Sequence, residues 1–188
     1  MLHLSITSLL ALLLWASLGD TFPRKTPALP QPCSLSKYQF LAPRELKAMK
    51  KMMEHFEDIM LLLDRQCQTR LFHRKWKLAE LSVPDRIMLV EAELDLATAM
   101  LELPTTPAFA EMRQRPHAFL TQAREDLRGC MATEASSHQP SKKLKHRLQK
   151  LQTARKTETT DCLQFSTILH LFQVLNDLQC VALREQCT

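Results

Sequence analysis

The chain has 188 residues, a formal net charge of +5 and only two glycines, Gly19 and Gly129. This length suggests one domain, and the scarcity of glycine argues against tight β-hairpins and phosphate-cradling loops, both of which depend on it. The mildly basic charge is compatible with anionic partners but specifies none.

The N-terminus has the pattern of a secretory signal peptide. Residues 9–14 are an apolar run, and the small residues Ser17 and Gly19 suit the −3 and −1 positions of a cleavage site. A membrane anchor is disfavoured because this run is too short to span a bilayer, and no later stretch approaches about 18 apolar residues. We therefore expect a secreted, extracellular protein without membrane insertion. Residues 1–19 are expected to be the signal peptide, 20–32 a proline-rich flexible tail and 33–188 a helical domain.

Six cysteines follow the signal peptide, and an even number in a secreted chain predicts three disulfides. They are Cys33, Cys67, Cys130, Cys162, Cys180 and Cys187. Six cysteines allow 15 pairings, and spacing alone favours only the close neighbours Cys180 and Cys187. The cysteines lack zinc-site spacing, so we expect no metal and no cofactor.

Proline positions divide the mature chain into helical segments. The first helix is expected over residues 43–64, because its apolar residues repeat at the three- and four-residue spacing of a bundle core. These residues are Leu46, Met49, Met53, Phe56, Met60 and Leu63. Met52 lies off this stripe and is the candidate for an exposed contact. Residues 65–83 lack a helical period and are expected to form a long loop across the bundle, pinned by Trp76.

Two helical regions are expected after the loop. One begins near Pro84, and the next begins near Pro107 with Thr106 as its N-cap and is interrupted or restarted at Pro116. Their core stripes are Ile87, Val90, Leu94, Ala97 and Leu101 in the first, and Phe119, Leu120, Ala123 and Leu127 in the second. The acidic residues Glu91, Glu93 and Asp95 lie between the stripe positions, and Glu91 and Asp95 are interpreted as a solvated face.

Two more helices complete the chain. Ser141 is expected to cap a short basic helix with Leu144, Leu148 and Leu151 inward, and the last helix opens near Asp161 with Gln164 in a capping box. The last helix has two apolar stripes, which indicates deep burial or an exposed binding face. They are Phe165, Ile168, Phe172 and Leu175, and Leu171, Val174 and Leu178. The fold is therefore all-α with five or six helices, and both up-down and long-crossover bundles remain open.

A run of basic residues is the most polarised feature, and no catalytic motif accompanies it. Weak glycosaminoglycan binding through Lys142, Lys143, Lys145, Arg147 and Lys150 is one interpretation, and a solvated helix face is the favoured one. The aromatic interleaving of nucleic-acid sites is absent, so no nucleic-acid partner is expected. Nucleophile-elbow, zinc-protease and nucleotide-binding motifs are also absent, so we expect no enzyme.

Several segments resemble the type III interferons, the lambda interferons. They are Cys33 with Ala42-Pro43-Arg44-Glu45-Leu46, the run of residues 67–76, Val90-Glu91-Ala92-Glu93-Leu94, Cys162-Leu163, Leu171-Phe172, and Cys180 with Cys187. The resemblance covers nearly the whole mature chain. It implies a six-helix class II cytokine bundle with a long loop after the first helix, and the disulfides Cys33–Cys130, Cys67–Cys162 and Cys180–Cys187.

The same resemblance implies an antiviral cytokine, acting as a monomer, that binds interferon lambda receptor 1 and the interleukin-10 receptor beta subunit and triggers JAK–STAT signalling. The implied contacts with the first receptor are Pro43, Leu46, Lys50, Phe72, Leu169 and Phe172. Leu169 stands where the family has an aromatic residue, and the helical pattern assigns Leu46 and Phe172 to the core instead. The second receptor face would use the first helix and residues 119–128. The alternative is another helical cytokine of the interleukin-10 group with a different receptor pair.

Overall fold

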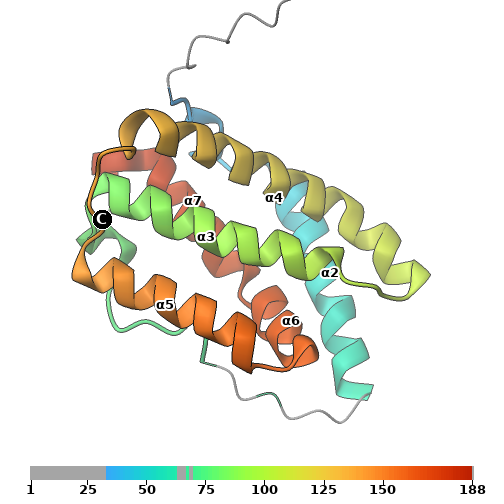
Figure 1. The fold of residues 1–188 in the computed structure, drawn as a ribbon. Helices are drawn as coiled ribbons and strands as arrows, with labels where there is room; N and C mark the ends of the chain where they lie inside the picture. The colour runs from blue at the N-terminus through green and yellow to red at the C-terminus, as the bar shows by residue number, and fades with distance from the viewer. Residues whose placement is uncertain (1–32, 63–66, 68–69, 188) are drawn as a thin grey trace, which may run out of the picture. The chain divides into compact units, whose positions relative to one another are not determined.

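The computed structural model describes residues 33–62, 67 and 70–187, which form an all-helical bundle (Figure 1). Its α-helices are α2 (Pro43–Leu62), α3 (Val83–Glu102), α4 (Pro107–Glu134), α5 (Lys142–Thr157), α6 (Thr160–Leu169) and α7 (Leu171–Leu183). Three 3-10 turns, η1 (Ser36–Tyr38), η2 (Leu78–Glu80) and η3 (Arg184–Gln186), complete this part of the chain, which contains no strand. The predicted signal peptide, the tail of residues 20–32 and the predicted first-helix end at residue 64 lie outside the described residues.

Hydroxyl side chains cap four of the helices. The predicted caps are confirmed: Thr106 accepts a hydrogen bond from the amide of Phe109 at 3.4 Å, and Ser141 accepts one from Leu144 at 3.3 Å. Ser82 caps α3 in the same way. The predicted cap at Asp161 is wrong, because Thr159 caps α6 and Asp161 lies inside its first turn.

The helix breaks differ from those expected from proline. α4 continues through Pro116, although proline cannot donate to the preceding turn, and Pro116 is buried where α4 packs on its neighbours. The expected interruption at Pro116 is therefore wrong. The last helical region divides instead at His170, which has a non-helical backbone between α6 and α7.

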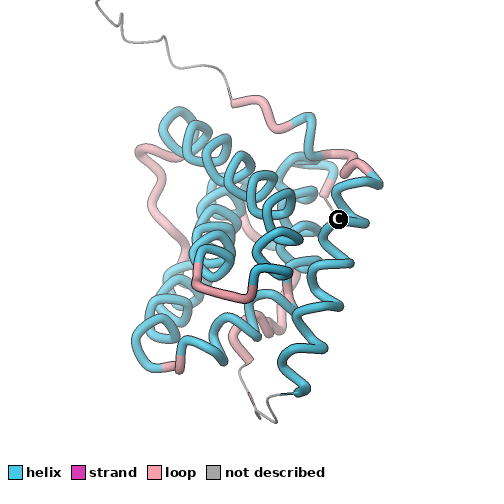
Figure 2. Tube along the Cα trace, turned by 90° about the vertical axis from the view of Figure 1, so that its right-hand side faces the viewer, coloured by secondary structure: helices cyan, strands magenta, loops and turns pink. Residues whose placement is uncertain are grey.

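Figure 2 shows the described helices and the loops that join them, and Figure 1 shows α3 at the centre of the bundle. α3 contacts α4, α5, α6 and α7. Its residues Leu89, Val90, Leu94 and Leu96 are fully buried, which requires apolar surface on more than one side of the helix. α2 is covered by both α4 and α6. Met52 is consequently fully buried, and the prediction that it is exposed is wrong.

The described part of the segment between α2 and α3, residues 67 and 70–82, lies across the bundle, as predicted for the loop of residues 65–83. Leu71 and Phe72 are buried, and Leu78 and Leu81 are buried near η2. Trp76 is half-buried against the core, with the Arg74 guanidinium 5.5 Å from its ring centroid. The long loop is therefore held by several apolar anchors, of which Trp76 is one.

Three disulfides join the described elements, and they are the three pairs that the resemblance implied. Cys33–Cys130 and Cys67–Cys162 close long stretches of chain, with sequence separations of 97 and 95 residues. Cys180–Cys187 closes a short one of 7 residues, from the last turns of α7 to the residue after η3. Within the described part of the chain, no helix is both long and apolar enough to cross a membrane.

Candidate binding surface

The long loop is fixed against the junction of α6 and α7. The Cys67–Cys162 disulfide ties its beginning to α6. Further along, the Phe72 ring stacks on His170 with 5.2 Å between ring centroids, and the side-chain amide of Gln173 donates to the Phe72 carbonyl at 3.1 Å. Loop, junction and α7 therefore form one continuous surface in which the loop backbone has a defined path.

A cluster of four charges lies beneath this surface: Glu93, Arg147 and Asp177 are buried, and the Arg74 side chain is 11% exposed. Glu93 of α3 accepts a 2.7 Å hydrogen bond from Arg147 of α5 and lies 3.7 Å from the guanidinium of Arg74, which also pairs with Asp177 of α7. Arg147 additionally donates to the Leu71 carbonyl. Two cations and two carboxylates balance the charge of the cluster. The loop is joined to α3 and α7 by the ion pairs of Arg74, and to α5 by the hydrogen bond from Arg147 to the Leu71 carbonyl.

Burial dominates the electrostatics of this cluster. Desolvation and the nearby negative charge of Asp177 raise the pKa of Glu93 to about 7, against the lowering influence of Arg147 and Arg74. Four polar atoms of the cluster lack a hydrogen-bond partner: Arg74 Nη1, Glu93 Oε2, Arg147 Nε and Asp177 Oδ2. The hydrogen-bonding capacity of the cluster is thus only partly used. Loss of one ion pair would leave further buried polar atoms without a partner and so weaken the rest of the cluster.

The sequence interpretation missed this cluster. The pattern puts Glu93 between the stripe positions of its helix and Arg147 in a solvated basic run, whereas both are buried in the structure. A signal was present: Leu89, Glu93 and Leu96 follow helical spacing, so Glu93 interrupts a second apolar stripe of α3. A buried carboxylate in such a stripe requires cationic partners, and these come from segments distant in sequence.

The three predicted contacts of α2 are three and four residues apart, so they lie on one side of this helix. Pro43 is exposed at the start of α2, Leu46 is half-buried one turn later, and Lys50 is exposed one turn beyond. Lys50 forms a surface ion pair with Glu54 at 3.6 Å. Leu46 packs against the core and also retains exposed surface, so the core and contact interpretations of this residue are compatible.

The other three predicted contacts differ in exposure. Leu169 and Phe172 are half-buried on either side of the His170 break, and Phe172 packs against the core. Phe72 is fully buried, so the prediction that its side chain contacts a partner directly conflicts with the structure. Its stacking on His170 makes it an anchor for the loop instead.

The basic run also divides into different environments. Arg147 is buried in the charge cluster, so its expected role as an exposed polyanion contact is wrong. Lys143 pairs with Glu80 at 2.7 Å, and Lys150 donates to the Arg70 carbonyl at 2.5 Å. Lys142 and Lys145 are exposed.

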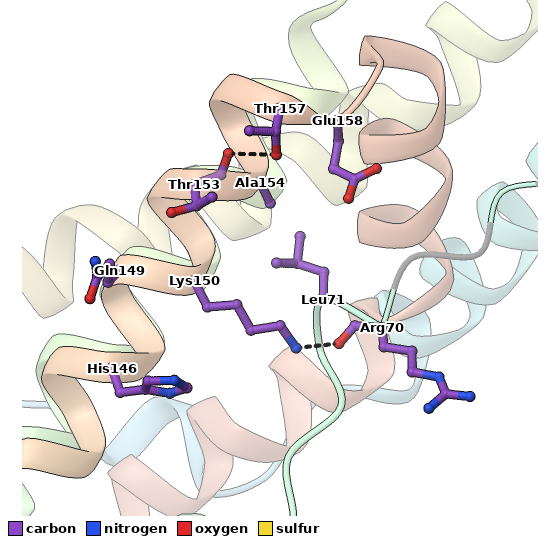
Figure 3. A pocket seen from close by; sticks show the side chains of 9 residues that line it. All are labelled: Arg70, Leu71, His146, Gln149, Lys150, Thr153, Ala154, Thr157 and Glu158. Atoms are coloured by element: carbon purple, nitrogen blue, oxygen red, sulfur yellow. Dashed lines mark hydrogen bonds between the residues drawn. The ribbon is translucent and has the colours of Figure 1, made fainter.

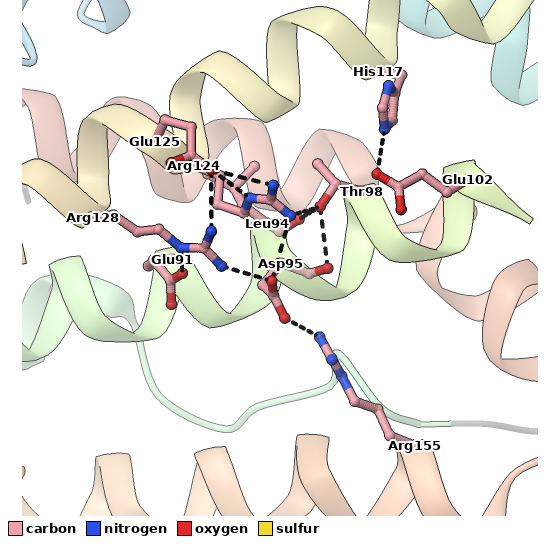
Figure 4. Close-up of polar contacts among 10 residues, drawn as sticks. All are labelled: Glu91, Leu94, Asp95, Thr98, Glu102, His117, Arg124, Glu125, Arg128 and Arg155. Carbon is pink, nitrogen blue, oxygen red and sulfur yellow. Dashed lines mark hydrogen bonds and ion pairs between the residues drawn. The ribbon is translucent and has the colours of Figure 1, made fainter. Parts of the chain in front are cut away.

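The acidic side of α3 is more than a solvated face. Glu91 accepts from Arg128 of α4 at 2.7 Å, and Asp95 contacts Arg128, Arg124 and Arg155 (Figure 4). This network links α3 to both α4 and α5. Such partly exposed pairs individually contribute little to stability, but they fix the orientation of the α4 arginines.

A disulfide-linked bundle with a long, fixed loop after its first helix has the architecture of a class II helical cytokine. A sequence model of one family, described as Interleukin-28A, matches residues 30–184. The chain belongs to the interferon lambda family and is a cytokine of the type III interferon group.

Similar proteins support this assignment over most of the chain. The chain is 63% identical to Interferon lambda-3 of Gallus gallus over 183 residues, which cover 97% of each protein. It is 34% identical to Interferon lambda-2 of Mus musculus over the full length of both chains. It is 31% identical to Interferon lambda-1 of Homo sapiens over 82% of this chain and 78% of that protein.

Proposed function

We propose that this protein is a secreted antiviral cytokine that acts by binding and not by catalysis. As a monomer it joins interferon lambda receptor 1 to the interleukin-10 receptor beta subunit outside the cell, and the paired receptors start JAK–STAT signalling. Family membership is the observation that carries the proposal. The chain itself contributes a rigid scaffold, so that contacts on separate helices keep a fixed spacing.

The surface proposed for interferon lambda receptor 1 includes Pro43, Leu46 and Lys50 of α2, and Leu169 and Phe172 at the α6–α7 junction. α2 packs against α6, so these residues belong to adjoining elements. The loop is part of the same surface, with Phe72 holding its backbone from below. Aromatic side chains are enriched in protein interfaces, so we expect Phe172 to contribute more to binding than the leucines of this surface.

The second surface, for the interleukin-10 receptor beta subunit, is proposed on α2 and on residues 119–128 of α4. These elements pack against each other, and Tyr38 of η1 closes the same region by stacking edge-on against Phe119. Tyr38 also donates to Asp126 at 2.6 Å, and burial together with this bond raises the pKa of the tyrosine.

The decisive experiment applies the purified protein to epithelial cells with interferon lambda receptor 1 and to matched cells from which this receptor has been deleted. We expect STAT phosphorylation only in the first. Its absence there would contradict the proposal. A response that persists in the deleted cells would favour the alternative, an interleukin-10-group cytokine with another receptor pair, which a binding panel of class II receptors would identify.

Replacement of Phe172 by alanine is expected to weaken binding to interferon lambda receptor 1 by about 2 kcal/mol, because an interface anchor would be lost. Surface plasmon resonance with the purified receptor ectodomain measures the change. Phe165→Ala is the control: Phe165 is also half-buried, but its ring lies 6.5 Å from that of Phe56 inside the bundle. It should lower the melting temperature without changing the affinity of the folded protein. If Phe172→Ala behaves like this control, Phe172 is a core residue and not a contact.

A further inference from the structure

A hollow of about 510 Å³ opens between α5 and the beginning of the described loop (Figure 3). Arg70 lies on the loop side, and His146, Gln149, Lys150 and Thr153 lie on the α5 side. Lys150 extends across the hollow to the Arg70 carbonyl. The site thus combines cationic groups with an amide and hydroxyls, beside the apolar Leu71 and Ala154.

The electrostatics of α5 favour an anion here. The helix contains no aspartate or glutamate in its 16 residues. Lys142 and Lys145 are exposed, and within the described residues neither forms an ion pair with a carboxylate. By helical spacing, Lys142 lies on the same side as His146, Gln149 and Thr153, so the positive surface continues from the hollow toward the N-terminus of α5, where the helix dipole is also positive.

The pKa of Lys150 reflects the positive charge that already lies near the hollow. Partial burial, with a further contribution from the buried Arg147 guanidinium, lowers the pKa of its ammonium. An anion beside Lys150 would favour its charged form and so offset this lowering. The one carboxylate in the lining, Glu158, follows the C-terminus of α5, so an anionic group is best accommodated at the Lys150 and His146 side.

The geometry points to a sulfated polysaccharide as the ligand of this hollow and of the lysines that extend from it. A sugar ring has apolar C–H faces and hydroxyls that suit Leu71, Ala154, Gln149 and Thr153, and its sulfates suit Lys142, Lys145 and Lys150. A repeating polyanion can occupy the hollow and the exposed lysines together, whereas a single phosphate cannot. This inference depends on the proposed secretion, because such polymers are found at cell surfaces, but it does not depend on receptor identity.

The test measures binding of the purified protein to a fluorescent heparin octasaccharide by anisotropy at about 0.15 M NaCl, a salt concentration that screens distant charges. Lys142→Gln with Lys145→Gln leaves the hollow intact, and a triple variant adds Lys150→Gln. Lys47→Gln with Lys51→Gln on α2 is the matched control, because it removes the same charge as the double variant. We expect the triple variant to bind about tenfold more weakly, the double variant to show part of this loss, and the control to bind like the unmodified chain.

Three outcomes would overturn the inference. Equal losses in the α5 double variant and the α2 control would indicate a response to net charge alone. Equal binding of a desulfated octasaccharide would exclude recognition of sulfate. Binding to phosphatidylserine vesicles but not to heparin would assign the surface to a membrane. Thermal melting checks that the Lys150→Gln chain folds, and parallel receptor binding by all variants distinguishes failure of this inference from failure of the proposed function.

Discussion

Replacement of Arg147 by methionine is expected to lower the free energy of unfolding by about 3–5 kcal/mol, the usual cost of removing one partner from a buried ion pair. Arg147 is almost completely buried, and its guanidinium contacts both the Glu93 carboxylate and the Leu71 carbonyl. Methionine occupies a similar volume but provides neither charge nor donor. The variant leaves a buried carboxylate without its nearest cation and a loop carbonyl without that donor.

The stability difference should also depend on pH. The pKa of Glu93 is raised to about 7 in the folded protein, so the folded chain binds a proton more strongly than the unfolded chain. The stabilising contribution of this proton to the free energy of unfolding is therefore lost as pH rises through 7. Without Arg147 the pKa of Glu93 rises further, so the free energy of unfolding of the variant continues to fall at higher pH. The gap between the two proteins should therefore be smaller near pH 5 and larger near pH 8, as measured by urea unfolding at both values.

Lys145→Met is the control for this experiment. Lys145 belongs to the same helix and carries the same charge, but it is exposed, so its replacement should change stability by less than about 0.5 kcal/mol. If the Arg147 variant were no less stable than this control, the charge cluster would contribute nothing to holding the loop. A gap that narrowed with rising pH would contradict the role assigned to Glu93.

The sequence predicted most of the fold because periodicity and capping are local properties. The stripe residues Leu94 and Ile87 are buried, and Thr106 and Ser141 begin helices where their hydroxyls can accept from the first turn. The prediction for Met52 fails because a single apolar stripe predicts the core side of a helix that is covered on one side only. α2 is covered on two sides, by α4 and by α6. How many sides are covered depends on the other helices.

The candidate binding surface was less predictable for a related reason. Family resemblance implies that Phe72 and Phe172 are contacts, but neither the resemblance nor the helical pattern predicts how deeply each side chain is buried. Phe72 stacks on His170, the residue at which α6 ends and α7 begins, and no proline or glycine in the sequence predicts a helix break there. Likewise, one partner of Glu93, Arg147, lies 54 residues away on α5, and the other, Arg74, lies in the long loop. Contacts of that separation are decided by tertiary packing.

Removal of the Cys33–Cys130 disulfide, by alanine at both positions, is expected to lower the free energy of unfolding by about 4–5 kcal/mol. In the chain-entropy model a cross-link restricts the unfolded chain more when it closes a longer loop, and this one closes 97 residues. Cys180–Cys187 closes only 7, for which the same model gives about 2–3 kcal/mol.

The two alanine pairs form a matched comparison, because each removes one buried cysteine, Cys130 or Cys180, and one half-buried cysteine. Loss of packing should therefore be similar, and the difference of about 2 kcal/mol between the variants reports the length of the closed loop. Guanidinium unfolding without reductant measures both. Equal losses would mean that these bonds act through local contacts in the folded protein. A larger loss for the long loop would mean that Cys33–Cys130 stabilises the bundle by restricting its unfolded chain.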